Sequence, residues 1–173
     1  MRAVVQRVKD ASVTVDGSVT GSITQGLLVY LGVAADDSEK DADWMAEKVA
    51  HIRIFEDAQG KMNLSIKDIL AAVGVNSANE SSVGTNSVGA SSAGVCSVGV
   101  LTVSQFTLLA DARKGRRPYY GDAAEPEKAN ALYEYFRAKI SEQGLKSEAG
   151  IFQAHMDVRY TNDGPVTIIL DSR

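Results

Sequence analysis

The sequence predicts a single α/β domain built on antiparallel sheets with two main helices. Short apolar runs separated by turn residues occupy both ends of the chain, and two helical patterns lie between them. A length of 173 residues is enough for one well-buried core and short for two. Hydrophobic residues at 45% and charged residues at 23% are ordinary for a globular protein, so we expect residues 1–173 to form one domain.

The N-terminal segment predicts a small antiparallel sheet. Val4 to Val8 and Val13 to Val15 are short apolar runs of the kind found in strands. Asp16-Gly17 is a hairpin turn signal that joins the second run to Val19 and its neighbours. The fold therefore begins with strands that are close in sequence.

A strand and a helix are predicted next. Residues 27–33 form an unbroken apolar run, which suits a central strand buried on both faces. Ser38 can cap the helix, whose apolar residues recur at positions i, i+3, i+4 and i+7. Residues 51–55 then alternate between polar and apolar side chains, which predicts a further strand. The apolar helix positions are Ala42, Met45, Ala46 and Val49.

The clearest helix lies near the C-terminus. Pro126 suits its first turn, and Gly144 is typical of the position just after a helix ends. Two final strands, 156–160 and 166–170, flank the segment 162–165. One apolar stripe runs along the helix and consists of Ala129, Leu132, Tyr133, Phe136 and Ile140.

Residues 73–102 differ from the rest because they repeat in units of five, from VGVNS to VGVLT. Gly, Ser, Ala and Val offer too little bulky side chain to offset the entropy of ordering the segment. We therefore expect a flexible, low-complexity insertion at about 71–97, with Val98 to Thr102 doubling as a strand. A short β-solenoid is the alternative, but only valine is available to fill its interior.

Composition limits the classes of protein. A net charge of −4 argues against a protein that coats nucleic acid through bulk electrostatics. Charged residues within the first nine positions interrupt any signal peptide, and no long apolar run follows. The one cysteine, Cys96, has no partner for an intramolecular disulfide. We expect a cytoplasmic protein without a membrane segment.

A compact basic segment precedes two tyrosines. Positive charge beside aromatic surface suits contacts with RNA phosphates and bases. Most charge runs of this kind are solvated loops, and charge alone favours that interpretation. The segment contains Arg113, Lys114, Arg116 and Arg117, followed by Tyr119 and Tyr120.

Two short segments are the most informative in the chain: SQFTL at 104–108 and NDGPVT at 162–167. Each adjoins an apolar run and places small polar groups where a strand ends, which is where sites usually lie. Glycine permits almost any backbone angle, whereas proline fixes its own and lacks an N–H group. The Gly164-Pro165 bond also has an appreciable chance of being cis, and the chain has only three prolines.

The usual catalytic motifs are absent from the sequence. It contains no G-x-S-x-G, H-E-x-x-H, P-loop or G-x-G-x-x-G pattern and no Cys/His ligand cluster. His51 and His155 are more typical of structural or surface histidines than of catalytic bases. Ser104, Gln105 and Thr107 remain as one compact polar group, and capping the strand end is their simplest role.

The two segments closely resemble the paired signature motifs of the D-aminoacyl-tRNA deacylases. These enzymes hydrolyse the ester of a D-amino acid, or of glycine, mischarged on tRNA. The resemblance covers nearly the whole chain except residues 71–97, and its motifs occur in the family's order. The other matching segments are 1–8, 63–68, 114–118 and 152–156.

The resemblance implies a barrel-like roll and a homodimer that acts on the aminoacylated end of tRNA without a cofactor or metal. The expected reaction is hydrolysis of D-aminoacyl-tRNA and of glycyl-tRNA mischarged on alanine tRNA. The 2′-hydroxyl of the terminal adenosine would assist the attack on the ester. A non-enzymatic RNA-binding module on the same fold is the alternative, and an esterase with Thr107 as nucleophile would differ only in mechanism.

The resemblance also implies roles for the residues of the first motif. Ser104 and Gln105 would hold the loop in shape, and the backbone N–H groups of Phe106 and Thr107 would face the ester oxygen as an oxyanion hole. Met156 would lie beside the pocket. Gln153 departs from the family pattern, in which a small residue is common at that position.

The second motif would act across a dimer. Gly164-Pro165 of the partner subunit would leave no room for an L side chain, so that selection is by exclusion. Asn162 belongs to the same motif, and Arg7 resembles the arginine that braces the turn. The expected tRNA contacts are Arg113, Lys114, Arg116 and Arg117.

Overall fold

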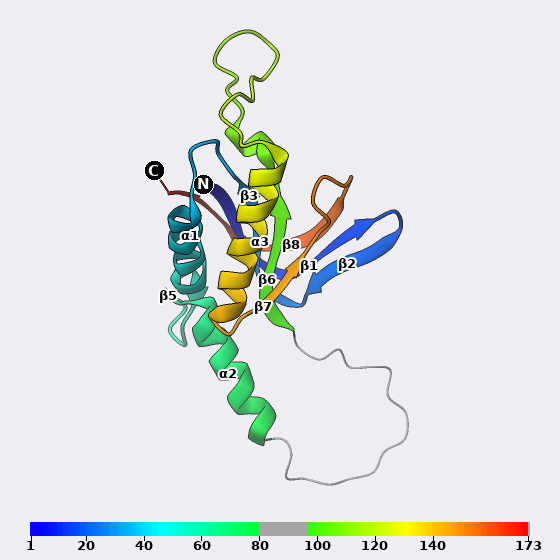
Figure 1. Cartoon of the computed structure of the whole chain (residues 1–173). Coiled ribbons are helices and arrows are strands. Elements are labelled where there is room, and N and C mark those ends of the chain that lie inside the picture. Colours follow the sequence, from blue (N-terminus) through cyan, green and yellow to red (C-terminus); the bar gives the residue numbers. More distant parts are fainter. Residues whose placement is uncertain (80–96, 173) are drawn as a thin grey trace.

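The structure of the protein is a computed structural model that describes residues 1–79 and 97–172. Within them, six strands form one curled sheet and three α-helices pack on the same face of it (Figure 1). The α/β class and the rolled sheet are therefore confirmed. The elements are β1 (Arg2–Val15), β2 (Ser18–Ile23), β3 (Gln25–Gly32), α1 (Glu39–His51), β4 (Phe55–Glu56), β5 (Met62–Leu64), α2 (Ile66–Asn79), β6 (Val98–Ser104), the 3-10 helix η2 (Phe106–Leu109), α3 (Pro126–Glu142), β7 (Lys146–Ala149) and β8 (Asp157–Asp171).

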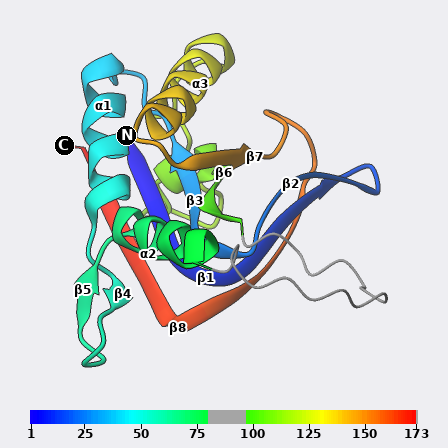
Figure 2. The ribbon, with the colours of Figure 1, turned by 90° about the horizontal axis from the view of Figure 1, so that it is seen from below.

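Strand β1 organises the sheet. It pairs antiparallel with β3 through its first half, with β2 through its second half, and with β8 along the opposite edge. Figure 2 shows how strongly β1 curves between these partners. The two runs predicted at 4–8 and 13–15 are thus parts of one strand. Because this strand bends, its two halves pair with different neighbours in the same sheet.

The sheet is mixed rather than wholly antiparallel. Strand β6 runs parallel to β3, and β7 runs parallel to β6. Parallel neighbours need long crossover connections, and the chain supplies them with α1 and α2 before β6 and with α3 before β7. The strand order is β2-β1-β3-β6-β7, with β8 beside β1.

The two final strands predicted at 156–160 and 166–170 are one continuous strand, β8. Two further local predictions are wrong. His51 is the last residue of α1 instead of the first of a strand, because the Ile52 N–H still donates to the Lys48 carbonyl oxygen at 2.9 Å. Only Phe55 and Glu56 form a strand there. The second difference is α2, a third helix that the sequence reading did not include.

Helix α2 begins at a reciprocal cap. The Asp68 carboxylate accepts from the Ser65 N–H at 2.8 Å, and the Asp68 N–H donates to the Ser65 hydroxyl at 3.3 Å. The Ser65 N–H and the Ser65 hydroxyl both donate to the Asp68 carboxylate and lower its pKa. The helix continues to Asn79 and so includes residues 71–79 of the predicted insertion, of which Val73 packs against the core. The rest of the insertion, 80–96, lies outside the described residues.

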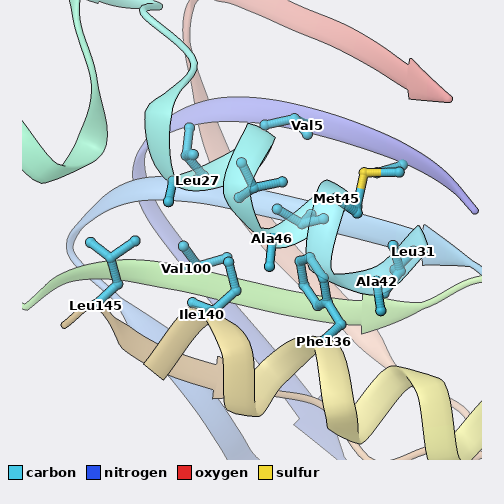
Figure 3. Close-up of a cluster of buried hydrophobic side chains, with 14 of the residues drawn as sticks. Val5, Leu27, Leu31, Ala42, Met45, Ala46, Val100, Phe136, Ile140 and Leu145 are labelled. Carbon is cyan, nitrogen blue, oxygen red and sulfur yellow. The ribbon is translucent and has the colours of Figure 1, made fainter. Parts of the chain in front are cut away.

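The main core lies between the helices and the sheet. Met45 and Ala46 of α1 and Phe136 and Ile140 of α3 face Val100 of β6 from the same side (Figure 3). All five are at most 1% exposed, as the apolar spacing of the two helices predicts.

A second apolar cluster fills the inside of the roll. Val8 and Val13 of β1 meet Leu28 of β3 and Leu101 and Val103 of β6 there. Residues of β3 and β6 alternate between the two clusters, so these two strands are buried on both faces, as predicted for the central run 27–33. None of the described helices is long and apolar enough to cross a membrane.

Candidate active site

The first polar segment begins where the buried strand β6 ends. The Gln105 N–H donates to the Leu31 carbonyl oxygen of β3 at 2.8 Å, which ties the turn to the centre of the sheet. Gly32 allows this approach, because a Cβ atom there would lie 3.0 Å from the Gln105 carbonyl oxygen. The sheet thus fixes the backbone just before the single turn of helix η2.

Two hydrogen bonds, one between side chains and one between backbone groups, hold the next residues of the turn. The Gln105 side-chain amide donates to the Thr107 hydroxyl, and the Thr107 carbonyl oxygen accepts from the Ala110 N–H at 3.1 Å. The N–H groups of Phe106 and Thr107 lie at the start of η2, where a helix has no preceding carbonyl for its first donors. This arrangement can present backbone donors to a bound oxygen atom.

A cavity of about 800 Å³ lies against this turn. It is lined by four of the predicted site residues: Ser104, Gln105, Phe106 and Met156. Sequence reasoning missed most of the remaining walls. Among them are Tyr30, Ala129, Tyr133, Phe152 and His155.

Tyr133 forms a rigid wall of the cavity. Its hydroxyl donates to the Thr102 carbonyl oxygen at 2.9 Å, and its ring centroid is 6.0 Å from that of Phe152. Burial raises the pKa of Tyr133 to about 12, so the phenol is protonated at neutral pH. Tyr30 behaves similarly, because burial and the neighbouring Tyr160 raise its pKa to about 12.

Gln153 occupies an unusual backbone conformation at the rim. Its φ angle is +62°, in the left-handed region that favours glycine, and its side chain is exposed while lining the cavity. Glycine would adopt this backbone conformation more easily than glutamine does.

The second polar segment forms a bulge in β8. Gln6 pairs with Thr167 and Val8 with Asn162, so residues 163–166 lie opposite Arg7 alone. Asn162 closes the bulge, because its side-chain oxygen accepts from the Val166 N–H at 3.0 Å. Its amide nitrogen donates to the Thr167 hydroxyl at 3.2 Å. The Gly164-Pro165 bond within the bulge is cis.

Arg7 supports the bulge from beneath. Its Nε atom donates to the Asp163 carbonyl oxygen at 3.2 Å, and its Nη1 atom donates to the Ile54 carbonyl oxygen at 2.6 Å. Gly164 has φ +126°, and a Cβ atom there would lie 2.7 Å from the Val166 side chain and 3.2 Å from Arg7 Nη2. The bulge therefore requires glycine within its own chain.

The two signature segments do not meet within one chain. Gly164 and Pro165 are exposed, and neither they nor Arg7 and Asn162 line the 800 Å³ cavity. The first motif and Met156 thus define one surface, and the second motif defines another.

The basic segment is a hairpin loop closed by Asp111 and Tyr119, whose backbones exchange two hydrogen bonds of 2.8 Å. It projects from the body of the molecule beyond the start of α3 (Figure 1). Arg113 is bound within the loop: its guanidinium donates to both carboxylate oxygens of Asp111 and holds the pKa of that carboxyl at about 2. Of the four predicted basic contacts, Arg113 is thus already paired.

The other three basic residues, Lys114, Arg116 and Arg117, are exposed. They form no ion pair with any residue that the structure describes. Their charges therefore remain available to a ligand.

Comparison with known proteins places the chain in a class of hydrolases that act on the ester bond of aminoacyl-tRNA. A family model described as D-Tyr-tRNA(Tyr) deacylase matches residues 4–77 and 82–171. The protein belongs to this family.

Relatives match this chain over nearly their full length. The D-aminoacyl-tRNA deacylase of Anaeromyxobacter dehalogenans is 52% identical over 100% of this chain and 98% of its own. Those of Koribacter versatilis and Thermotoga petrophila are 50% and 49% identical and are covered over 98% and 97% of their lengths, against 100% and 99% of this chain.

Solved structures share the fold. A protein described as c-Myc DNA Unwinding Element Binding Protein has a TM-score of 0.79 and 33% identity, over 100% of this chain and 99% of its own. A probable eukaryotic D-amino acid tRNA deacylase has a TM-score of 0.70 at 14% identity, over 98% of this chain and 97% of its own.

Proposed function

We propose that the protein hydrolyses the ester bond of D-aminoacyl-tRNA, and of glycyl-tRNA mischarged on alanine tRNA, as a proofreading step in translation. The observation that carries the proposal is the turn at Gln105–Thr107 beside the cavity, in a chain about half identical to deacylases over their full length. The cavity accepts the terminal adenosine with its attached amino acid.

The turn would stabilise the charge that develops on the ester oxygen. Two backbone donors, the N–H groups of Phe106 and Thr107, suit an oxyanion, and one such donor contributes about 3 kcal/mol. Gln105 and Thr107 fix each other's side chains, which keeps these donors in place. Because no nucleophile and base pair lies in the motif, the 2′-hydroxyl of the RNA assists the attack.

Selection against L-amino acids would come from a second subunit. In a homodimer, the exposed Gly164-Pro165 bulge of the partner enters the cavity and blocks the position of an L side chain. Arg7, Asp163 and Asn162 stiffen the bulge. This arrangement explains why the second motif lies outside the cavity of its own chain.

The tRNA backbone would be held by the basic hairpin loop. Lys114, Arg116 and Arg117 are the contacts to phosphates, since Arg113 already pairs with Asp111. Arg113 instead keeps the loop in shape.

Hydrolysis of matched tRNA esters tests the proposed function. The purified protein, with excess chelator, should deacylate D-tyrosyl-tRNA and glycyl-tRNA and leave L-tyrosyl-tRNA intact. Equal rates on the two enantiomers contradict the proposal. Binding of tRNA without hydrolysis would support the RNA-binding alternative.

A further inference from the structure

Two exposed aromatic side chains meet at the edge of the cavity, and a third is next to them in the chain. Phe106 lines the cavity and is 57% exposed, and the ring of Tyr120 meets it edge-on at a centroid distance of 5.1 Å. Tyr119, the residue before Tyr120 in the chain, is 67% exposed. We call these three residues the aromatic row. Large exposed aromatic surface beside a cavity is typical of a binding surface rather than of an inert one.

Gly121 determines where the most exposed of these rings, that of Tyr119, lies. A Cβ atom built on Gly121 would be 2.0 Å from the Tyr119 hydroxyl oxygen and 2.2 Å from Cζ. The phenol of Tyr119 therefore rests against the backbone of Gly121, in a space that only glycine leaves open. This packing orders an exposed ring that would otherwise be free to rotate.

The charge around the aromatic row suits nucleic acid. Lys114, Arg116 and Arg117 lie in the hairpin loop that Tyr119 closes, and they have no ion-pair partner among the described residues. Exposed aromatic rings beside free cations are the features with which proteins bind single-stranded nucleic acid. The rings stack on bases, and the cations contact phosphates.

We propose that the aromatic row binds the unpaired cytidines that precede the terminal adenosine of tRNA. The inference rests on the proposed function, which places that adenosine in the cavity. The next nucleotides then leave past the exposed ring of Phe106, against which Tyr120 packs, one residue from Tyr119. Tyr119, the most exposed of the three rings, stacks on a cytosine, and the loop cations neutralise the phosphates between these nucleotides.

Two minimal substrates test this inference: the D-tyrosyl ester of adenosine and the D-tyrosyl ester of the trinucleotide CCA. We expect kcat/KM to be at least about tenfold higher for the trinucleotide ester, because stacking of one base on an aromatic ring has an effect of this size. The measured quantity is the ratio of the two kcat/KM values.

Variants test whether the aromatic row causes the difference in kcat/KM between the two esters. Tyr119→Ala should lower it about tenfold, whereas Tyr119→Phe should keep it, since stacking does not need the hydroxyl. Gly121→Ala keeps the ring but displaces it, and it should lower the ratio as well. The matched control is Trp44→Ala, because Trp44 is also exposed beside a cation, Lys48, but lies on α1 away from the cavity.

Each outcome bears on one claim. Equal kcat/KM values for the two esters in the parent protein overturn the inference while leaving the deacylase function intact. A ratio that survives Tyr119→Ala but falls when the loop cations are replaced shows that only phosphates are bound, which also overturns it. If the parent protein hydrolyses neither ester and does not act on D-tyrosyl-tRNA, the proposed function itself fails.

Discussion

Arg7 and Asp163 join the two longest strands at the bulge of β8, with Arg7 Nε 3.0 Å from an Asp163 carboxylate oxygen. The Arg7 side chain is only 5% exposed, and its other hydrogen bond reaches the Ile54 carbonyl oxygen. A buried guanidinium that is satisfied in this way fixes the position of the bulge, because its loss would remove the donor of the Ile54 carbonyl oxygen and of both the carbonyl oxygen and the carboxylate of Asp163.

Arg7→Met should therefore lower the free energy of unfolding by about 2 kcal/mol. Arg2→Met is the matched control, because Arg2 also joins β1 to an aspartate of β8, Asp171, but both side chains are partly exposed. The control should lose less than about 1 kcal/mol. Urea unfolding of both variants measures the difference, and equal losses would show that burial of Arg7 does not matter.

Thr107→Ala should reduce deacylation of D-tyrosyl-tRNA by less than about tenfold. The Thr107 hydroxyl accepts a hydrogen bond from Gln105, so its removal loosens the turn without removing the backbone donors. Thr107→Ser should restore full activity. A loss of about 10³-fold or more in single-turnover rate would instead identify Thr107 as a nucleophile.

The sequence predicted those elements whose signals recur over a long, continuous segment of the chain. Helix α3 was predicted from its stripe, its first-turn proline and its terminal glycine, and the structure confirms all three features. Helix α2 was missed because its second half has the Gly/Ser/Val composition of the repeat. The Ser65-x-x-Asp68 pattern, a capping box, was the signal that could have revealed it.

The site was predictable only in part. The SQFT segment indicated the turn, because polar residues at the end of a buried strand are a local signal. Tyr133 gave no such signal. It belongs to the apolar stripe of α3, and the spacing of a stripe does not tell a residue that lines a cavity from one that is buried in the core. The contact between Arg7 and Asp163 joins residues 156 positions apart, so it came only from resemblance to a family.

Alkaline pH should destabilise the protein through Tyr133. Its pKa is about 12 in the folded protein and about 10 when unfolded, so the protonated phenol stabilises the fold fully below pH 10. As pH rises from 10 to 12, we expect a loss on the order of 2 kcal/mol. Tyr133→Phe should lack this part of the decline. Urea unfolding at pH 9 and pH 11 measures it, and identical slopes for both proteins would contradict the assignment.

Gln153→Gly should give a more stable protein than Gln153→Ala, by about 1 kcal/mol. Alanine is normally the more stabilising of the two, but φ at this position is +62°, where a Cβ atom is unfavourable. Urea unfolding compares the variants. If the alanine variant is the more stable, residue 153 does not hold the left-handed conformation in solution.

Mixing two defective proteins should restore activity if each site is built from two chains. Pro165→Ala impairs the bulge but leaves the cavity intact, whereas Gln105→Ala impairs the turn but leaves the bulge intact. In a mixed dimer, the cavity of the first chain meets the bulge of the second, which gives one working site. With random exchange, half of the dimers are mixed, so about a quarter of the parent activity on D-tyrosyl-tRNA should return.

The control for this mixing experiment is a protein that carries both substitutions, added to either single variant. It should restore nothing with Gln105→Ala, because no intact cavity is then present, and nothing with Pro165→Ala, because no intact bulge is present. Refolding from urea allows the subunits to exchange, and size-exclusion chromatography measures the dimer. If the Pro165→Ala and Gln105→Ala mixture shows only the mean of its two residual activities, the bulge does not act on the partner's cavity.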